Sequence, residues 1–114
     1  MIGASENPDR YSYKAVKMLV KQGHPVVAVG LRSGAIDDVI IMKGTPVFEG
    51  IHTISLYVNP LNQEFYLDYI LALLPQRIIF NPGTFNDKLA QLANDGGIET
   101  VEGCTLVMLS LGNY

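Results

Sequence analysis

The chain opens with the segment Met1-Ile2-Gly3-Ala4-Ser5-Glu6-Asn7-Pro8-Asp9-Arg10-Tyr11, which is the most informative part of the sequence. Its apolar start runs into small residues, and a helical pattern follows. This order predicts a strand, a tight turn and a helix N-terminus in quick succession. Such a junction gathers backbone N–H groups and the positive end of a helix dipole at one point, which suits a phosphate group.

Three residues of this stretch support a helix that begins inside it. Asn7 is a favourable N-cap, and Pro8 fits the first helical position, where a missing N–H costs nothing. Arg10 then falls in the first helical turn, where its guanidinium can add a charge-assisted bond to the same anion. Taken alone, the stretch also fits a well-capped turn that binds nothing.

Outward from this junction, strand and helix patterns alternate along the whole chain, which is typical of a parallel α/β sheet. The predicted strands are 1–4, 26–29, 39–42, 53–58, 77–80 and 98–101, and the predicted helices are 8–22, 63–74, 85–95 and 104–111. Residues 30–38 and 43–52 are predicted as loops. The last helix is expected to pack on the sheet. We therefore predict one domain over residues 1–114, a three-layer, Rossmann-like, doubly wound parallel sheet with strand order 3-2-1-4-5.

Composition and charge exclude several classes of protein. The chain has 114 residues, 48% hydrophobic and 17% charged, as in ordinary globular domains. A net charge of −3 argues against nucleic acid as a partner. No apolar run is long enough to cross a membrane, and no secretory signal is evident. Because Cys104 is the single cysteine, we expect no disulfide framework and a reducing, cytoplasmic setting, and His24 and His52 lack the spacing of a zinc site.

Small or polar residues follow four of the predicted strands. In an open parallel sheet, ligands bind beyond the carboxyl ends of the strands. Turn residues are common at strand ends in any protein, but their joint occurrence at one edge of the sheet predicts a ligand cleft. These segments are Gly3-Ala4-Ser5, Gly30-Leu31-Arg32, Asn59-Pro60 and Asn81-Pro82-Gly83.

Two details favour a ligand with a phosphorylated ribose. The glycine fingerprint GxGxxG of dinucleotide-binding proteins is absent, because Ser5 and Asn7 stand where further glycines would be. The acidic residue that holds the ribose hydroxyls of NAD is also absent after the second strand, and Arg32 stands there instead. An arginine can pair with a ribose phosphate, which points to coenzyme A or NADP. Arg32 also fits a solvated loop cation.

No catalytic set emerges from the sequence. Ser5 lacks a GxSxG elbow, and neither histidine has a nucleophile near it in the sequence. Cys104 fits an inert thiol better than a nucleophile. A non-catalytic binding module is therefore the main hypothesis, and a small NADP-dependent reductase, with Tyr57 or Cys104 as proton donor, is the enzyme alternative.

The quoted motifs resemble one known family. Gly3-Ala4-Ser5-x-Asn7-Pro8-x-Arg10-Tyr11, with the later segments Tyr57-Val58-Asn59-Pro60 and Asn81-Pro82-Gly83, is similar to the small stand-alone CoA-binding domain proteins. These proteins are similar in turn to the N-terminal, CoA-binding domain of the succinyl-CoA synthetase alpha subunit. The resemblance covers nearly the whole chain, and the opening motif is its most specific part.

The resemblance implies a Rossmann-like domain that binds coenzyme A or an acyl-CoA. It implies that residues 3–11 face the CoA diphosphate and that Gly30-Leu31-Arg32 lies near the adenosine end. Tyr11, by its position in the chain, is near enough to the first turn to touch a ligand. Many members have Asn-Pro where this chain has Gly30-Leu31. Such departures leave open a third hypothesis, a ligand-free interaction or regulatory subunit. A homodimer of that kind would use Tyr66, Tyr69 and residues 106–111 as its exposed surface.

Overall fold

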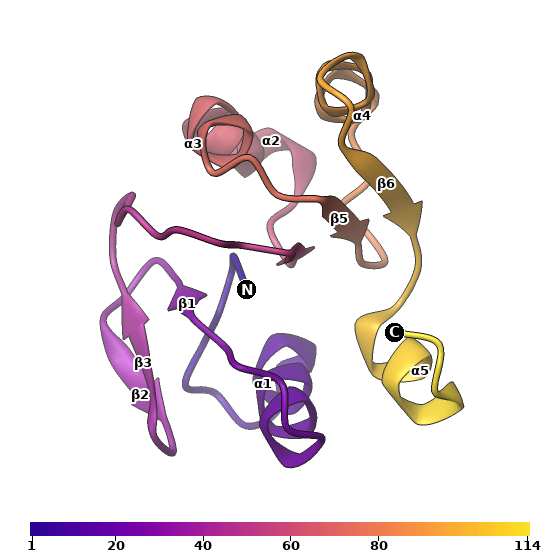
Figure 1. Cartoon of the computed structure of the whole chain (residues 1–114). Helices are drawn as coiled ribbons and strands as arrows, with labels where there is room; N and C mark the ends of the chain where they lie inside the picture. The colour runs from indigo at the N-terminus through magenta and orange to yellow at the C-terminus, as the bar shows by residue number, and fades with distance from the viewer. The chain divides into compact units, whose positions relative to one another are not determined.

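The computed structural model describes all residues, 1–114, and the chain forms two compact units. The first unit contains Met1–Pro46 and Thr105–Tyr114, and the second contains Val47–Cys104. Both units contain helices and strands, which alternate along the chain in the second unit (Figure 1). The α/β class predicted from the sequence is therefore confirmed, whereas the single domain over residues 1–114 stays a prediction. None of the helices has the length and apolarity that a bilayer crossing requires.

The first unit is a small mixed sheet with two helices. Its elements are α1 (Tyr11–Lys21), β1 (Ala28–Val29), β2 (Gly34–Ile36), β3 (Val39–Met42) and α5 (Thr105–Leu111). The strand order is β1-β3-β2, and Ile2 adds a single parallel bridge to Val29 on the other side of β1. The predicted first strand is thus present as one bridge, in the expected place beside β1.

The core of the first unit forms where α1 covers the sheet. The buried residues of this cluster are Ala4, Val16, Ala28, Ile36 and Ile41. Val16 and Leu19 lie one turn apart on the buried face of α1, as the helical apolar pattern predicted. Helix α5 contacts α1, and the Gln22 side chain donates a hydrogen bond to the Leu109 carbonyl at 3.2 Å.

The prediction of a purely parallel sheet is wrong in the first unit. Residues 34–36, predicted as part of a loop, form β2 and pair antiparallel with β3. The pairing of Ile36 with Val39 leaves a two-residue turn, Asp37-Asp38, and Asp37 has a positive φ of 51°. Tight hairpin turns need a left-handed residue, and aspartate tolerates that conformation better than most residues.

The second unit is a parallel three-stranded sheet with helical connections. Its elements are β4 (Thr53–Leu56), α2 (Pro60–Gln63), the 3₁₀ helix η1 (Glu64–Tyr66), α3 (Leu67–Ala72), β5 (Arg77–Phe80), α4 (Asp87–Asp95) and β6 (Glu99–Glu102). The strand order is β4-β5-β6, with Thr53 beside Arg77 and Arg77 beside Glu99. Apolar side chains of β4 and β5 are buried with Leu89 and Ala93 of α4. The complete order 3-2-1-4-5 stays a prediction, because it also requires the first predicted strand beside the fourth.

Two helix boundaries in the second unit differ from the prediction. The helix predicted over 63–74 is divided into α2, η1 and α3, and its N-cap is Asn59 rather than Asn62. Asn59 is extended and Pro60 follows at the first helical position, so the Asn-Pro pair itself begins the helix. Phe85 lies outside α4, whose N-cap is Asn86. In the first unit, the last helix, predicted over 104–111, is confirmed as α5.

Candidate functional site

The predicted phosphate loop, residues 3–10, is held at its start by the carbonyl of Val29. The N–H groups of Gly3 and Ala4 donate to this oxygen at 2.9 and 3.0 Å. Gly3 adopts a positive φ of 97°, which glycine tolerates without strain. These two amides are therefore engaged within the fold, and the expectation that the whole junction offers unpaired N–H groups is wrong at its first two residues.

Asn7 shapes the second half of this loop but does not cap α1. Its side-chain Oδ1 accepts the Asp9 N–H at 3.0 Å, and its carbonyl accepts the Arg10 N–H at 3.0 Å. Its own N–H donates to Ser5 Oγ at 3.1 Å. Pro8 and Asp9 therefore belong to a separate turn, and α1 begins at Tyr11. The predicted helix start at Pro8 is wrong because the Asn7 side chain closes a local turn, a known alternative to capping.

The N-terminus of α1 consequently has no cap of its own. Arg10 is the N-cap residue, no side chain caps the helix, and the first turn contains no acidic residue. The N–H groups of Tyr11, Ser12 and Tyr13 precede the first helical hydrogen bond, which Lys14 donates to Arg10 at 3.2 Å. An uncapped first turn leaves these donors and the helix dipole to solvent or to an anion.

The side chains around this helix start are exposed and include cations. Arg10 is exposed at the N-cap position, and the Tyr11 ring is 69% exposed. The ammonium group of Lys14 lies 5.5 Å from the centre of the Tyr11 ring. The N-terminal end of α1 thus presents backbone donors, one aromatic face and two positive charges.

Gly30 has a structural reason to be glycine. A Cβ at this position would collide with the Ala4 carbonyl oxygen and would touch the Ile41 side chain. The Gly30 N–H donates to the Met42 carbonyl at 3.0 Å. The structure therefore brings Gly30 against the first loop, as predicted, whereas Leu31 is 78% exposed and Arg32 is also exposed.

Glu6 is a residue of the first loop that sequence reasoning missed. Its carboxylate Oε2 accepts the N–H of Ala35 in β2 at 3.1 Å. The carboxylate also covers Gly34, where any Cβ would collide with it. The two residues are 29 positions apart, so only the fold brings them together.

In the second unit, the predicted site residues follow the neighbouring strands β4 and β5. Asn59 Oδ1 accepts the Asn62 N–H at 3.0 Å, and Pro60 starts α2. Asn81 is only 1% exposed and donates from Nδ2 to Ser55 Oγ and the Leu56 carbonyl, at 3.0 and 2.9 Å. The amide group of Asn81 thus joins the ends of β4 and β5. Pro82 and Gly83, with its φ of 85°, form the exposed turn after it.

Gln63 is a second residue that the sequence did not indicate. Its side chain is fully buried and donates from Nε2 to the carbonyls of Val58 and Thr84 at 2.7 and 2.6 Å. Its Oε1 accepts a hydrogen bond from Asn86 Nδ2 at 3.0 Å. One buried amide therefore connects the loop after β4, which contains Asn59, with the loop after β5, which contains Asn81. A polar residue in a helical pattern gives no sequence signal for this role.

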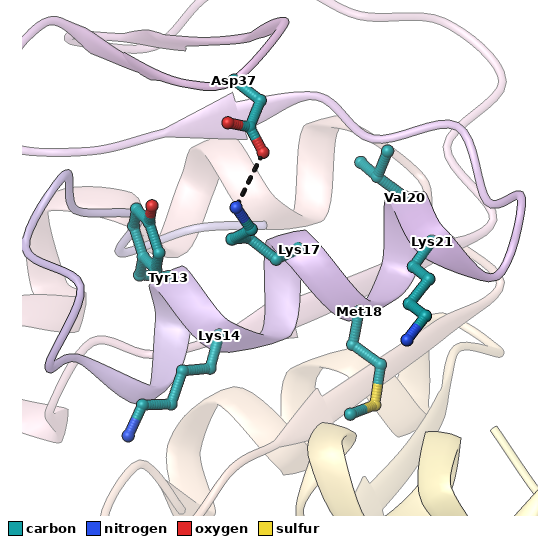
Figure 2. Close-up of a pocket in the computed structure, with 7 residues that line it drawn as sticks. All are labelled: Tyr13, Lys14, Lys17, Met18, Val20, Lys21 and Asp37. Atoms are coloured by element: carbon teal, nitrogen blue, oxygen red, sulfur yellow. Dashed lines mark ion pairs between the residues drawn. The ribbon is translucent and has the colours of Figure 1, made fainter.

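A shallow groove of about 470 Å³ lies beside α1 (Figure 2). Lys14, Lys17 and Lys21 line it with Tyr13 and Asp37. The Lys17 ammonium pairs with the Asp37 carboxylate at 3.0 Å, and this hydrogen bond and charge raise the pKa of Lys17. Because both side chains are exposed, the pair adds little stability. None of the predicted site residues lines this groove.

The remaining candidate groups are dispersed. Cys104 has a reduced, partly exposed thiol, and the His24 ring packs edge-on against Tyr114 with centroids 4.9 Å apart. His52 Nδ1 lies 2.7 Å from Thr53 Oγ1. No three His, Cys, Asp or Glu side chains come together in a way that could hold a metal ion.

Charge is divided unevenly between the two units. The first unit carries six of the eight Lys and Arg residues but four of the eleven Asp and Glu residues, for a net charge of +2. The second unit carries two basic and seven acidic residues, for a net charge of −5. The unit with the uncapped helix is therefore basic in a chain that is acidic overall.

Together, a parallel strand bridge, a glycine turn and an uncapped helix start in a basic unit define an α/β protein suited to an anionic ligand. Residues 1–110 match the protein family described as "CoA binding domain". The chain belongs to this family.

Solved structures of similar proteins support the fold. The chain is similar to an uncharacterized protein of known crystal structure, with 45% identity and a TM-score of 0.96, over 99% of this chain and 93% of that one. It is also similar to a hypothetical protein from Pyrococcus horikoshii OT3, with 20% identity and a TM-score of 0.86, over 96% of this chain and 79% of that one. A Thermus thermophilus protein has 18% identity and a TM-score of 0.86, over 99% of this chain and 87% of that one. The latter two similarities concern the fold alone.

Proposed function

We propose that this protein binds coenzyme A or an acyl-CoA without catalysing a reaction, through the loop of residues 3–11 and the start of α1. Membership of the CoA-binding family supports the class of ligand. The observation that carries the proposal is the helix start itself, where three N–H groups, no acidic residue and the exposed Arg10 coincide. A diphosphate is the part of coenzyme A that such a terminus binds best.

The adenosine end of the ligand is proposed to lie near Gly30-Leu31-Arg32. The Ala4 carbonyl contacts the Gly30 position, so this turn and the phosphate loop belong to the same part of the first unit. Arg32 is exposed and forms no ion pair, so its guanidinium is available to a ribose phosphate. In the second unit, the proposed ligand contacts include four exposed residues, Asn59, Pro60, Pro82 and Gly83. Asn81 also stays a proposed contact, although it is buried and therefore less accessible than the other four.

Isothermal titration with coenzyme A, dephospho-CoA, NADP and NAD tests this proposal. We expect coenzyme A to bind, and to bind more tightly than dephospho-CoA, which lacks the ribose phosphate. Equal affinities of the two would remove the role given to Arg32. Tighter binding of NADP than of coenzyme A would favour the reductase alternative, and the absence of binding by all four would favour a ligand-free interaction protein.

A further inference from the structure

The Glu6 carboxylate closes the outer edge of the β2–β3 hairpin. Strand β2 is the last strand of the order β1-β3-β2, so one side of it has no partner strand. Ile36 and Val39 flank the two-residue turn, and Ala35 is opposite Ile40 at the next position. In an antiparallel pair successive residues point their N–H groups to opposite sides, so the Ala35 N–H faces away from β3. Glu6 Oε2 accepts this outward N–H at 3.1 Å.

Gly34 provides the space in which the carboxylate lies. A Cβ built on Gly34 would collide with the Glu6 carboxylate, and Glu6 Cγ would lie only 2.7 Å from it. Gly34 does not have a positive φ, so an alanine is compatible with its backbone. The glycine is therefore needed for the Glu6 side chain and not for the strand.

This contact fixes the middle of the loop that carries the proposed phosphate site. The loop is anchored at Gly3 and Ala4 by the Val29 carbonyl, and near α1 by the turn of Asn7. Between these anchors, the Glu6 hydrogen bond attaches the loop to the hairpin. It also directs the Glu6 carboxylate toward β2.

We propose that Glu6, Gly34 and the Ala35 N–H form a latch, here called the Glu6 latch, that positions the loop of residues 3–10 for its anionic ligand. Glu6 is a positioning residue that acts through the loop backbone. This inference rests on the proposed function, since the ligand is taken to be coenzyme A. The latch itself is a property of the protein without ligand.

Three variants and one control separate positioning from charge. Glu6→Ala removes the acceptor, Gly34→Ala displaces the carboxylate, and Glu6→Gln keeps a neutral acceptor. Asp38→Ala is the matched control, because it removes one negative charge from the same unit outside the loop of residues 3–11, and the exposed Asp38 side chain forms no ion pair. Affinities for coenzyme A are measured by titration, and the exchange of the Ala35 amide hydrogen by NMR without ligand.

If the latch positions the loop, Glu6→Ala and Gly34→Ala each speed exchange at Ala35 and weaken coenzyme A by about tenfold, the loss typical of one charge-assisted bond. Glu6→Gln restores most of the affinity, and Asp38→Ala leaves it unchanged or raises it slightly. The double variant Glu6→Ala/Gly34→Ala is no weaker than either single variant, because both remove the same contact.

The contrary results are equally definite. Unchanged or tighter binding by Glu6→Ala, as for Asp38→Ala, would mean that Glu6 contributes only its charge, and the positioning role would be lost. Unchanged exchange at Ala35 in Glu6→Ala would mean that the latch does not exist in solution. If the wild-type protein does not bind coenzyme A, the proposed function fails, whereas the exchange experiment still decides whether the latch exists.

Discussion

At the scale of single residues, Gly30 shows how closely the first loop approaches β1. A Cβ on residue 30 would overlap the carbonyl oxygen of Ala4. Neither atom can rotate away, because the carbonyl is part of the backbone and the Cβ is bonded directly to it. Gly30→Ala should therefore lower the free energy of unfolding by about 1–3 kcal/mol, the range for overpacking a tight site. Urea denaturation measures this loss. Gly96→Ala is the control, because the nearest neighbours of its Cβ are 3.5 Å away, and its effect should stay within about 0.5 kcal/mol.

Arg10 and Arg32 test the two ends of the proposed ligand. Arg10→Ala should weaken coenzyme A and dephospho-CoA alike, because Arg10 stands at the helix start assigned to the diphosphate. Arg32→Ala should weaken coenzyme A and leave dephospho-CoA nearly unchanged. Each loss should be about ten- to a hundredfold by titration, the value of one charge-assisted bond.

The control for these two variants is Lys43→Ala, which removes an exposed positive charge from the same unit. It should change neither affinity by more than a small factor. All three side chains are exposed, so the melting temperatures without ligand should barely move. Equal weakening of both ligands by Arg32→Ala would contradict the placement of the ribose phosphate.

At the scale of secondary-structure elements, the buried Gln63 amide connects the loops after β4 and β5. Gln63→Leu would leave the Val58 and Thr84 carbonyls and the Asn86 amide without this partner. Each unsatisfied buried group costs about 1–3 kcal/mol, so the variant should lose about 3 kcal/mol or more in urea denaturation. Gln91→Leu is the matched control, because Gln91 is exposed and bonds only Asp95 within α4, at 2.9 Å. A loss no larger than that of Gln91→Leu would mean that the loops do not depend on Gln63.

The aromatic pair of η1 and α3 predicts sensitivity to alkali. Burial raises the pKa of Tyr66, and burial with the nearby Tyr66 raises the pKa of Tyr69, both from a usual value of 10.0. A tyrosine whose pKa is raised in the folded state stabilises the protein below the unfolded pKa, and this contribution is lost as pH rises through the folded pKa. The free energy of unfolding should therefore fall above pH 10. Tyr66→Phe should be nearly neutral at pH 7 and should flatten that decline.

The buried position of Tyr66 also corrects an expectation about a dimer surface. Tyr66 is only 3% exposed and packs edge-on against Phe65, with centroids 4.9 Å apart. It cannot be part of an exposed interface, although Val107 and Leu111 of α5 are exposed. A homodimer stays a hypothesis, and light scattering of the protein at high concentration tests it.

The elements that could be predicted from sequence are those that carry their own local signal. β5 matches its predicted range because Ile78-Ile79-Phe80 is a continuous apolar run that follows Arg77, and α4 ends at Gly96-Gly97 as expected. β2 was missed because its three residues are stable only when paired with β3, and Asp37-Asp38 is not a typical hairpin turn sequence. For the same reason the candidate site was predicted only in part. The turn at Gly3 is local, whereas the Glu6 contact with Ala35 depends on the fold.

At the scale of the whole molecule, the division of charge links the fold to the proposed ligand. Six basic residues lie in the first unit, and seven acidic residues lie in the second. An overall charge of −3 by itself would repel a polyanion such as coenzyme A. Arg10, Lys14 and Arg32 all belong to the basic unit. Their attraction for a ligand phosphate bound near them should therefore outweigh the repulsion from the net negative charge of the chain.

This arrangement predicts how affinity depends on salt. Raising the NaCl concentration from about 50 mM to about 500 mM shortens the screening length from over 10 Å to a few ångströms, so exposed charges attract the ligand less. The affinity for coenzyme A should fall across this range, and it should fall more steeply than that for dephospho-CoA, whose ribose phosphate is missing. In Arg32→Ala the salt dependences of the two ligands should become more alike, because the arginine proposed to bind the ribose phosphate is gone. Titrations of both proteins at several salt concentrations measure this, and equal slopes for the two ligands in the wild-type protein would contradict it.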